Sequence, residues 1–190
     1  YGFPESHSAS FALLAYVSAW LKCHHPVAFY VGLLNSQPMG FYSPSQLIQD
    51  ARRHHIMVLP VDVNHSSWDH QILSSADQQQ PPIRLGLRLI KGLSEAAGQR
   101  IHTAQRQRTF ANVADLRQRA CLDRGDMEAL AAADALSGIS GNRYQSHWQT
   151  MALEAHRPLL PHDSAAQRSQ DDAAVTAAPT LPEDVVADYQ

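Results

Sequence analysis

The chain has 190 residues, of which 44% are hydrophobic, and a formal net charge of -3. This length allows one ordinary domain or two small ones, and the hydrophobic fraction suits a folded protein. A slightly acidic total argues against a protein that binds polyanions through its overall charge alone. No apolar run reaches the roughly 18 residues that a membrane-spanning helix needs. We therefore expect a cytoplasmic protein with no membrane partner.

The charges are unevenly distributed along the chain. Residues 83–124 hold nine basic side chains against three acidic ones, whereas residues 154–190 hold seven acidic side chains and two arginines. A basic middle followed by an acidic end favours contact with nucleic acid through the middle, followed by a solvated tail.

The cysteines and histidines do not predict a metal site. Cys23 and Cys121 lie far apart without a CxxC pattern, which indicates reduced cytosolic thiols. The histidine pairs 24–25 and 54–55 are adjacent residues, so their side chains point to different faces of a helix instead of converging as ligands at i and i+4 would.

The first third of the chain predicts three helices. Pro4 and Glu5 suit a first helical turn, and apolar residues then recur at helical spacing up to Pro26, which disfavours helix in the residue before it. A second helix is predicted over residues 27–35 and a third from Ser43–Pro44 to about His55, followed by a short extended segment over residues 58–63.

The rest of the chain predicts shorter elements. Residues 66–82 are polar and contain a Gln-Gln-Gln-Pro-Pro stretch typical of a loop, and residues 83–87 alternate like a strand. Helices are predicted at about 94–105, 113–119, 126–133 and 142–153, and the Ala-, Asp- and Pro-rich remainder as a disordered tail or linker. The fold class predicted is mainly α with a few short strands.

The segment from Leu85 to Ile101 predicts a helix-hairpin-helix contact with DNA. An apolar element leads through Gly92, Leu93 and Ser94 directly into a helix, whose first amides are unpaired and attract a phosphate. Leu93 is expected to anchor the turn in the core. Such contacts position DNA without reading its sequence. The predicted DNA-binding residues are Lys91, Gly92, Leu93, Ser94, Arg100, Arg106 and Arg108.

Two alternatives remain open for this segment. Motifs of this kind usually have a second glycine where Ser94 stands, so the turn could be an ordinary glycine cap of a helix. The arginines could form a solvated basic face.

Long stretches of the chain resemble the bacterial C-family DNA polymerases, of the DNA polymerase III alpha type. The resemblance covers nearly the whole chain, and it is carried by residues 1–11, 16–26, 34–47, 50–54, 59–64, 84–93, 122–136 and 181–189. Within that family, the Phe-Pro-Glu-Ser-His of residues 3–7 and the Asn-Ser-Gln-Pro-Met-Gly-Phe-Tyr-Ser-Pro of residues 35–44 look like the error-prone, damage-inducible branch. The replicative branch more often has Asn-Lys in place of Pro4-Glu5.

The resemblance implies a division of the chain into parts. Residues 1–65 would form the end of the fingers domain, 66–82 a polar loop, 83–153 the helix-hairpin-helix region, and 154–190 a linker to a further domain. We expect the chain to be part of a longer polymerase.

The resemblance also implies an activity: DNA synthesis on a primer-template from deoxynucleoside triphosphates, across lesions and during damage-induced (SOS) repair. Such chemistry uses Mg²⁺ held by clustered carboxylates, which we expect in a palm domain upstream of Tyr1, so that these 190 residues would be inactive alone. A sliding clamp or mutagenesis accessory proteins are expected to bind elsewhere on the polymerase.

In the family, the element matching residues 1–7 lies beside the incoming nucleotide. We carry this over to Tyr1 and His7 only, because Glu5 stands where relatives commonly have lysine. An aromatic ring and an imidazole there would disfavour a 2′-hydroxyl on the sugar; His7 could instead serve as a hydrogen-bonding residue at the helix start. Two other functions stay open, namely a replicative alpha subunit and a non-enzymatic helix-hairpin-helix module.

Overall fold

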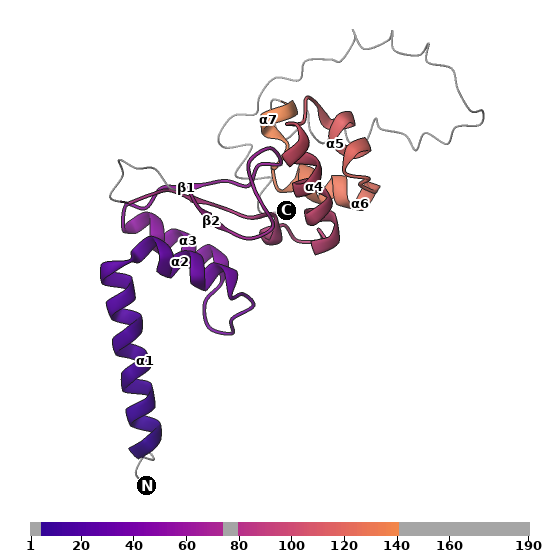
Figure 1. Ribbon diagram of the computed structural model, residues 1–190. Helices are drawn as coiled ribbons and strands as arrows, with labels where there is room; N and C mark the ends of the chain where they lie inside the picture. The colour runs from indigo at the N-terminus through magenta and orange to yellow at the C-terminus, as the bar shows by residue number, and fades with distance from the viewer. Residues whose placement is uncertain (1–4, 74–79, 141–190) are drawn as a thin grey trace, which may run out of the picture.

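The computed structural model describes residues 5–73 and 80–140. Within them the protein is mainly helical with one small sheet, as the sequence predicts (Figure 1). The predicted helix at 142–153 and the predicted tail at 154–190 lie outside the described residues.

Three helices form the first part. Helix α1 spans Glu5–His24, α2 spans Pro26–Asn35 and α3 spans Pro44–Arg53. Their limits follow from local chemistry. Pro26 opens α2 at its first position, where no amide hydrogen is needed, and Ser43 and Gln46 form a capping box at the start of α3.

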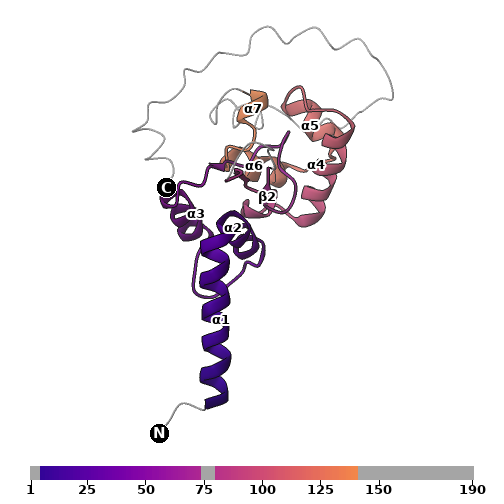
Figure 2. The same cartoon turned by 60° about the vertical axis from the view of Figure 1, so that its left-hand side comes forward.

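Helix α1 projects away from the rest of the protein (Figure 2). Its apolar side chains lie on several faces, and many are exposed: Phe11, Leu13, Leu14, Tyr16, Val17, Trp20 and Leu21. The apolar residues recur along α1 as the sequence predicts, but they do not form one stripe, and within the described structure they have no core to cover.

The base of α1 is fixed by a polar cluster between three helices. Lys22 donates a 2.7 Å hydrogen bond to the Asp50 carboxylate, which also accepts one of 2.6 Å from the buried Tyr30 hydroxyl. The bond from Lys22, then that from Tyr30, holds the pKa of Asp50 below its usual value. Burial is the main cause that raises the pKa of Tyr30.

The sheet has three short strands in the order β1-β3-β2. Strand β1 (Val58–Leu59) pairs in parallel with β3 (Ile83–Arg84), and β2 (Gln71–Ile72) pairs antiparallel to β3. Strand β2 lies within the stretch expected to be a loop, and β3 ends earlier than the predicted strand because residues 87–89 form a 3-10 helix, η1 (Leu87–Leu89).

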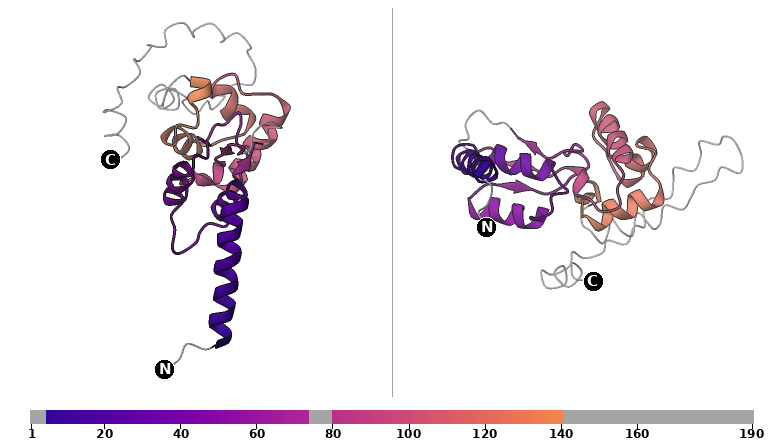
Figure 3. Two further views of the ribbon diagram at one scale, coloured as in Figure 1. Left: turned by 90° about the vertical axis from the view of Figure 1, so that its left-hand side faces the viewer. Right: turned by 90° about the horizontal axis from the view of Figure 1, so that it is seen from below.

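The second part is a cluster of helices. It consists of α4 (Glu95–Gln107), α5 (Val113–Arg119), α6 (Arg124–Ala132) and α7 (Ser137–Ser140). The first three begin at Ser94, Asn112 and Asp123, each of which accepts a hydrogen bond from the third helical residue's amide. Figure 3 shows these helices grouped together, with the sheet between them and α1.

One hydrophobic core joins the sheet to this helical cluster. Most of its fully buried members come from η1, α4, α5, α6 and the chain after α6, and they include Leu87, Ile101, Leu116, Leu130 and Leu136. Leu34 of α2 and Leu47 of α3 belong to the same core, so the first helices are packed onto it as well. No helix within the described ranges is both long and apolar enough to cross a bilayer.

Segment 66–70 holds the chain before α4 in place. The buried Ser66 hydroxyl donates to the Leu85 carbonyl at 2.7 Å, and the Gly86 amide donates to the His70 imidazole Nδ1 at 3.1 Å. A Cβ on Gly86 would overlap the Trp68 carbonyl and Asp69 backbone. The predicted polar loop therefore includes two polar residues, Ser66 and His70, that are buried and hydrogen-bonded.

The indole of Trp68 lies against Gly98 of α4, and this contact predicts an unusual response to substitution. Glycine to alanine in a helix normally stabilises by about 1 kcal/mol. At Gly98 the new methyl would overlap the Trp68 ring, so we expect Gly98→Ala to destabilise by about 1–2 kcal/mol. Urea unfolding followed by circular dichroism measures the change.

Gly32 in α2 is the matched control, since nothing lies within 4 Å of the position its Cβ would take. Gly32→Ala is expected to raise the free energy of unfolding. If both variants stabilise the protein, Trp68 does not restrict position 98.

His70 predicts a loss of stability in mild acid. Burial is the main cause that lowers its pKa to about 4 from an ordinary value of 6.5. The native state therefore binds fewer protons than the unfolded chain between these values, and stability falls as the pH drops from about 6.5 towards 4. The full loss is up to about 3 kcal/mol. Unfolding measured at several pH values checks this.

In His70→Gln the amide oxygen can still accept from Gly86, but the side chain does not titrate. The difference between the two pH curves isolates His70 from the other histidines. Parallel curves would exclude this role for His70.

Candidate nucleic-acid interface

The turn between η1 and α4, residues 90–94, has the geometry expected of a phosphate contact; we call it the first turn. Gly92 has a φ of +90°, which an L side chain rarely adopts. Leu93 is buried at 7% exposure, as predicted, and Ser94 accepts from the Ala97 amide at 3.1 Å. The backbone conformation requires glycine here. Lack of space does not, since the nearest atom to a Cβ built at this position would lie 3.8 Å away.

The amides of the first turn are available to an anion. The amides of Lys91, Gly92 and Ser94 donate to no acceptor among the described residues. Lys91 and Gly92 are exposed. Because the turn leads directly into α4, the positive end of that helix adds to the attraction of a phosphate oxygen. Glu95, in the first turn of α4, opposes it.

The predicted basic residues divide into two groups. Arg100 donates from Nε to the Ala120 carbonyl at 2.9 Å and lies 3.4 Å from Asp126, and Arg108 lies 3.0 Å from Asp115. Lys91 and Arg106 have no acidic partner within the described residues. Of the four predicted basic residues, these two can therefore bind a phosphate without breaking an ion pair.

The remaining arginines of the basic stretch also serve the protein itself. Arg119 donates to the carbonyls of Ala104 and Arg108 and lies over the Phe110 ring at 4.8 Å. Ion pairs with acidic side chains are formed by Arg88, Arg119 and Arg124. Counting charges along the sequence therefore overstates the positive charge that DNA would meet.

A second turn, residues 120–123, repeats the form of the first and was not predicted. Cys121 has a φ of +50°, Leu122 is 5% exposed, and Asp123 caps α6. Its amides are already bonded, however: those of Cys121 and Leu122 donate to backbone carbonyls, and that of Asp123 donates to the Asp126 carboxylate at 3.4 Å. Two acidic side chains at a helix start repel a phosphate, so of the two turns the first is the better anion site. The repeated order of a turn residue, leucine and a capping residue is the signal that sequence reasoning missed, because cysteine stands where the first turn has glycine.

The predicted nucleotide-proximal residues lie in α1 and before it. His7 is exposed near the start of α1, where its ring packs edge-on against Phe11 at 4.5 Å. Tyr1 lies outside the described residues. The structure does not bring His7 together with the first turn, since α1 projects away from the helices that carry it (Figure 1).

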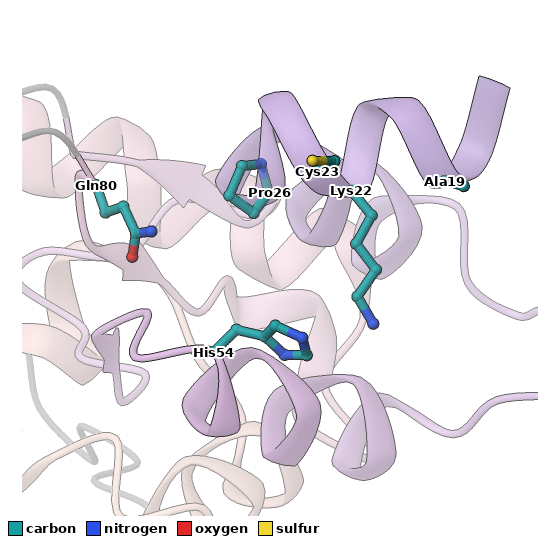
Figure 4. A pocket seen from close by; sticks show the side chains of 6 residues that line it. All are labelled: Ala19, Lys22, Cys23, Pro26, His54 and Gln80. Carbon is teal, nitrogen blue, oxygen red and sulfur yellow. The ribbon is translucent and has the colours of Figure 1, made fainter. Parts of the chain in front are cut away.

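A pocket of about 440 Å³ lies where α1 leaves the body of the protein. Figure 4 shows Lys22 of α1 and His54, which follows α3, along it, and the other lining residues are Ala19, Cys23, Pro26 and Gln80. The Lys22 ammonium is already paired with Asp50. The pocket therefore offers no unpaired cation to a phosphate, unlike the first turn.

Comparison with known proteins places the first turn within a known motif. A helix-hairpin-helix motif matches residues 55–146, which include both turns and segment 66–70. Error-prone DNA polymerases match the whole chain: 52% identical over 206 residues in Methylococcus capsulatus, 54% over 191 in Teredinibacter turnerae and 54% over 192 in Ralstonia nicotianae. The chain is homologous to a segment of the error-prone DNA polymerases. It spans 18–19% of the length of these relatives.

Homology to the error-prone DNA polymerases confirms the family predicted from sequence. It favours the DNA-backbone reading of the first turn over an ordinary helix cap, since the matched motif contains it. The assignment of single residues to DNA or nucleotide contact stays a prediction.

The first turn predicts a specific response of duplex binding. Gly92→Val places a β-branched side chain at a φ of +90°, which strains the turn and covers its amides. We expect the chain's affinity for duplex DNA to fall by tenfold or more, with helical content nearly unchanged. Fluorescence anisotropy and circular dichroism measure the two quantities. Unchanged binding with unchanged helicity would make the turn a structural cap only.

Lys91 and Arg106 predict part of the salt dependence. Neutralising one phosphate changes the logarithm of affinity by about 0.9 per tenfold change in salt, so these two residues together contribute about -1.8 to the slope. Arg106→Ala should reduce the slope by about 0.9. Arg124→Ala, which removes the same charge from a 2.7 Å ion pair with Glu128, is the control and should leave the slope unchanged. Equal effects of both variants would contradict the division of the arginines.

Proposed function

We propose that this chain serves an error-prone, DNA-directed DNA polymerase in translesion synthesis during damage-induced repair in the cytoplasm. The observation that carries the proposal is identity of 50–54% over the whole chain to proteins named error-prone DNA polymerase. The first turn supports it with a site suited to a DNA phosphate.

In this proposal the two ends of the described structure have different tasks. The first turn, with Lys91, holds the sugar-phosphate backbone of the primer-template, while the start of α1 approaches the incoming deoxynucleoside triphosphate through His7 and Tyr1. The contacts at the first turn are independent of sequence. This suits an enzyme that must synthesise DNA on any template.

Metal-dependent nucleotidyl transfer is assigned to other parts of the polymerase. Within residues 5–73 and 80–140, no group of three or more histidine, cysteine, aspartate or glutamate side chains converges as a metal site would require. The proposed chemistry uses Mg²⁺. We assign it to the palm of the same polypeptide, and the clamp and accessory contacts likewise to other regions.

The contribution of His7 can be tested in the full-length polymerase that contains this chain. If the imidazole packs against the incoming sugar, His7→Ala opens space for a 2′-hydroxyl. The ratio of kcat/KM for a deoxynucleotide to that for the matching ribonucleotide should fall about tenfold, which corresponds to about 1.4 kcal/mol. Single-nucleotide primer extension on an undamaged template and on one with an abasic site measures the ratio and the lesion bypass together.

His24→Ala is the control, because His24 is also an exposed histidine of α1 but lies at its opposite end. It should leave the ratio unchanged. If kcat/KM falls equally for the deoxynucleotide and the ribonucleotide in His7→Ala, His7 has a structural role only. A lack of primer extension by the wild-type enzyme would overturn the proposed function.

A further inference from the structure

The loop between α2 and α3, residues 36–43, presents aromatic side chains that the fold does not use; we call it the aromatic loop. Phe41 is 93% exposed and Tyr42 58% exposed, and Met39 between them and α2 is 37% exposed. Few large apolar side chains in a folded protein are left this open, and exposed apolar groups that cluster mark a contact site.

Hydrogen bonds preform the aromatic loop. The Gln37 side chain donates to the Tyr42 carbonyl at 3.1 Å and accepts from the Met39 amide at 2.9 Å. Ser43 closes the loop through its capping box with Gln46. Phe41 is therefore held out on a loop of defined shape, so that binding a partner costs little ordering of the backbone.

Arg88 joins the aromatic loop to the DNA-binding region. This residue of η1 donates to the Gln37 carbonyl at 3.2 Å and to the Asp69 carboxylate at 2.7 Å. Two residues later the chain enters the first turn. The aromatic loop is thus continuous with the proposed backbone contact through one side chain. The exposed aromatic residues of α1, by contrast, lie on a helix that projects away from it (Figure 3).

We propose that the aromatic loop is a stacking site for unpaired nucleobases of the template strand, with Phe41 as the base-contacting residue and Tyr42 beside it. This inference rests on the proposed function and adds a second kind of contact to it. Aromatic side chains next to a backbone-binding element hold single strands in this way, since every base offers a π-face and stacking needs no particular sequence. The first turn holds phosphates, and the aromatic loop holds bases where the duplex opens.

The test uses the full-length polymerase and two DNA probes with the same duplex. One probe has a single-stranded 5′ template overhang containing 2-aminopurine, and the other is blunt. Phe41→Ala should weaken binding of the overhang probe by about tenfold and leave binding of the blunt probe unchanged. It should also remove the fluorescence quenching that stacking on 2-aminopurine causes. Phe41→Trp should restore both, because indole also stacks.

Met57→Ala is the matched control: Met57 is likewise exposed, at 60%, but lies outside the aromatic loop, and its substitution should change neither probe. The proposal is overturned if Phe41→Ala lowers the affinity for the two probes equally, or lowers it for neither. The second result would mean that another part of the polymerase or a partner protein, and not DNA, contacts the loop. If the wild-type polymerase binds neither probe, the proposed function itself fails.

Discussion

Segment 66–70 occupies its place only because Gly86 and Gly98 have no side chains. A Cβ at either position would overlap Trp68 or the backbone beside it. In that space the segment accepts hydrogen bonds from the amides of residues 86–88 and donates one to the Leu85 carbonyl. The chain that leads into the first turn is therefore fixed on one side by backbone bonds and on the other by the core beneath Leu87 and Leu93. A turn with three open amides needs such support, since among the amides of residues 91–94 that of Leu93 alone donates to a carbonyl of the described residues, the Ile90 carbonyl.

The arginines show how far internal structure competes with an electrostatic surface. Arg100 and Arg119 tie α4 to the second turn and to α5 by donating to backbone carbonyls near the ends of helices. Asp115 forms ion pairs with Arg108 and Arg119, and its pKa is lowered chiefly by the hydrogen bond from the Ala111 amide. What remains for DNA is a small number of well-placed groups around the first turn, which agrees with a nearly neutral chain.

The sequence predicted the helices well and the contacts between distant segments poorly. Pro26, Ser43–Pro44 and Ser94 are local signals, and the helices begin where they indicate. Ser66 and His70 look like loop residues because they are polar, yet both are buried, and their partners lie 16 to 19 residues away in the chain. Strand β2 was missed for a related reason, since a strand of two residues has no periodicity to detect.

For the site, the first turn was identifiable because its glycine and leucine stand in a recognisable order. The pairing of Arg100 with Asp126, 26 residues away, was not. No rule of helical spacing reaches that far. The distinction between a structural and a DNA-facing arginine therefore became visible only with the fold.

Helix α1 has a consequence for how this stretch of protein behaves in solution. Seven large apolar side chains of α1 are more than a third exposed, and water disfavours such a surface by about 25 cal/mol for each Å². Two copies that meet along α1 would remove part of it from water. The stretch made alone should therefore dimerise or precipitate as its concentration rises, and charged residues introduced along α1 should keep it dissolved.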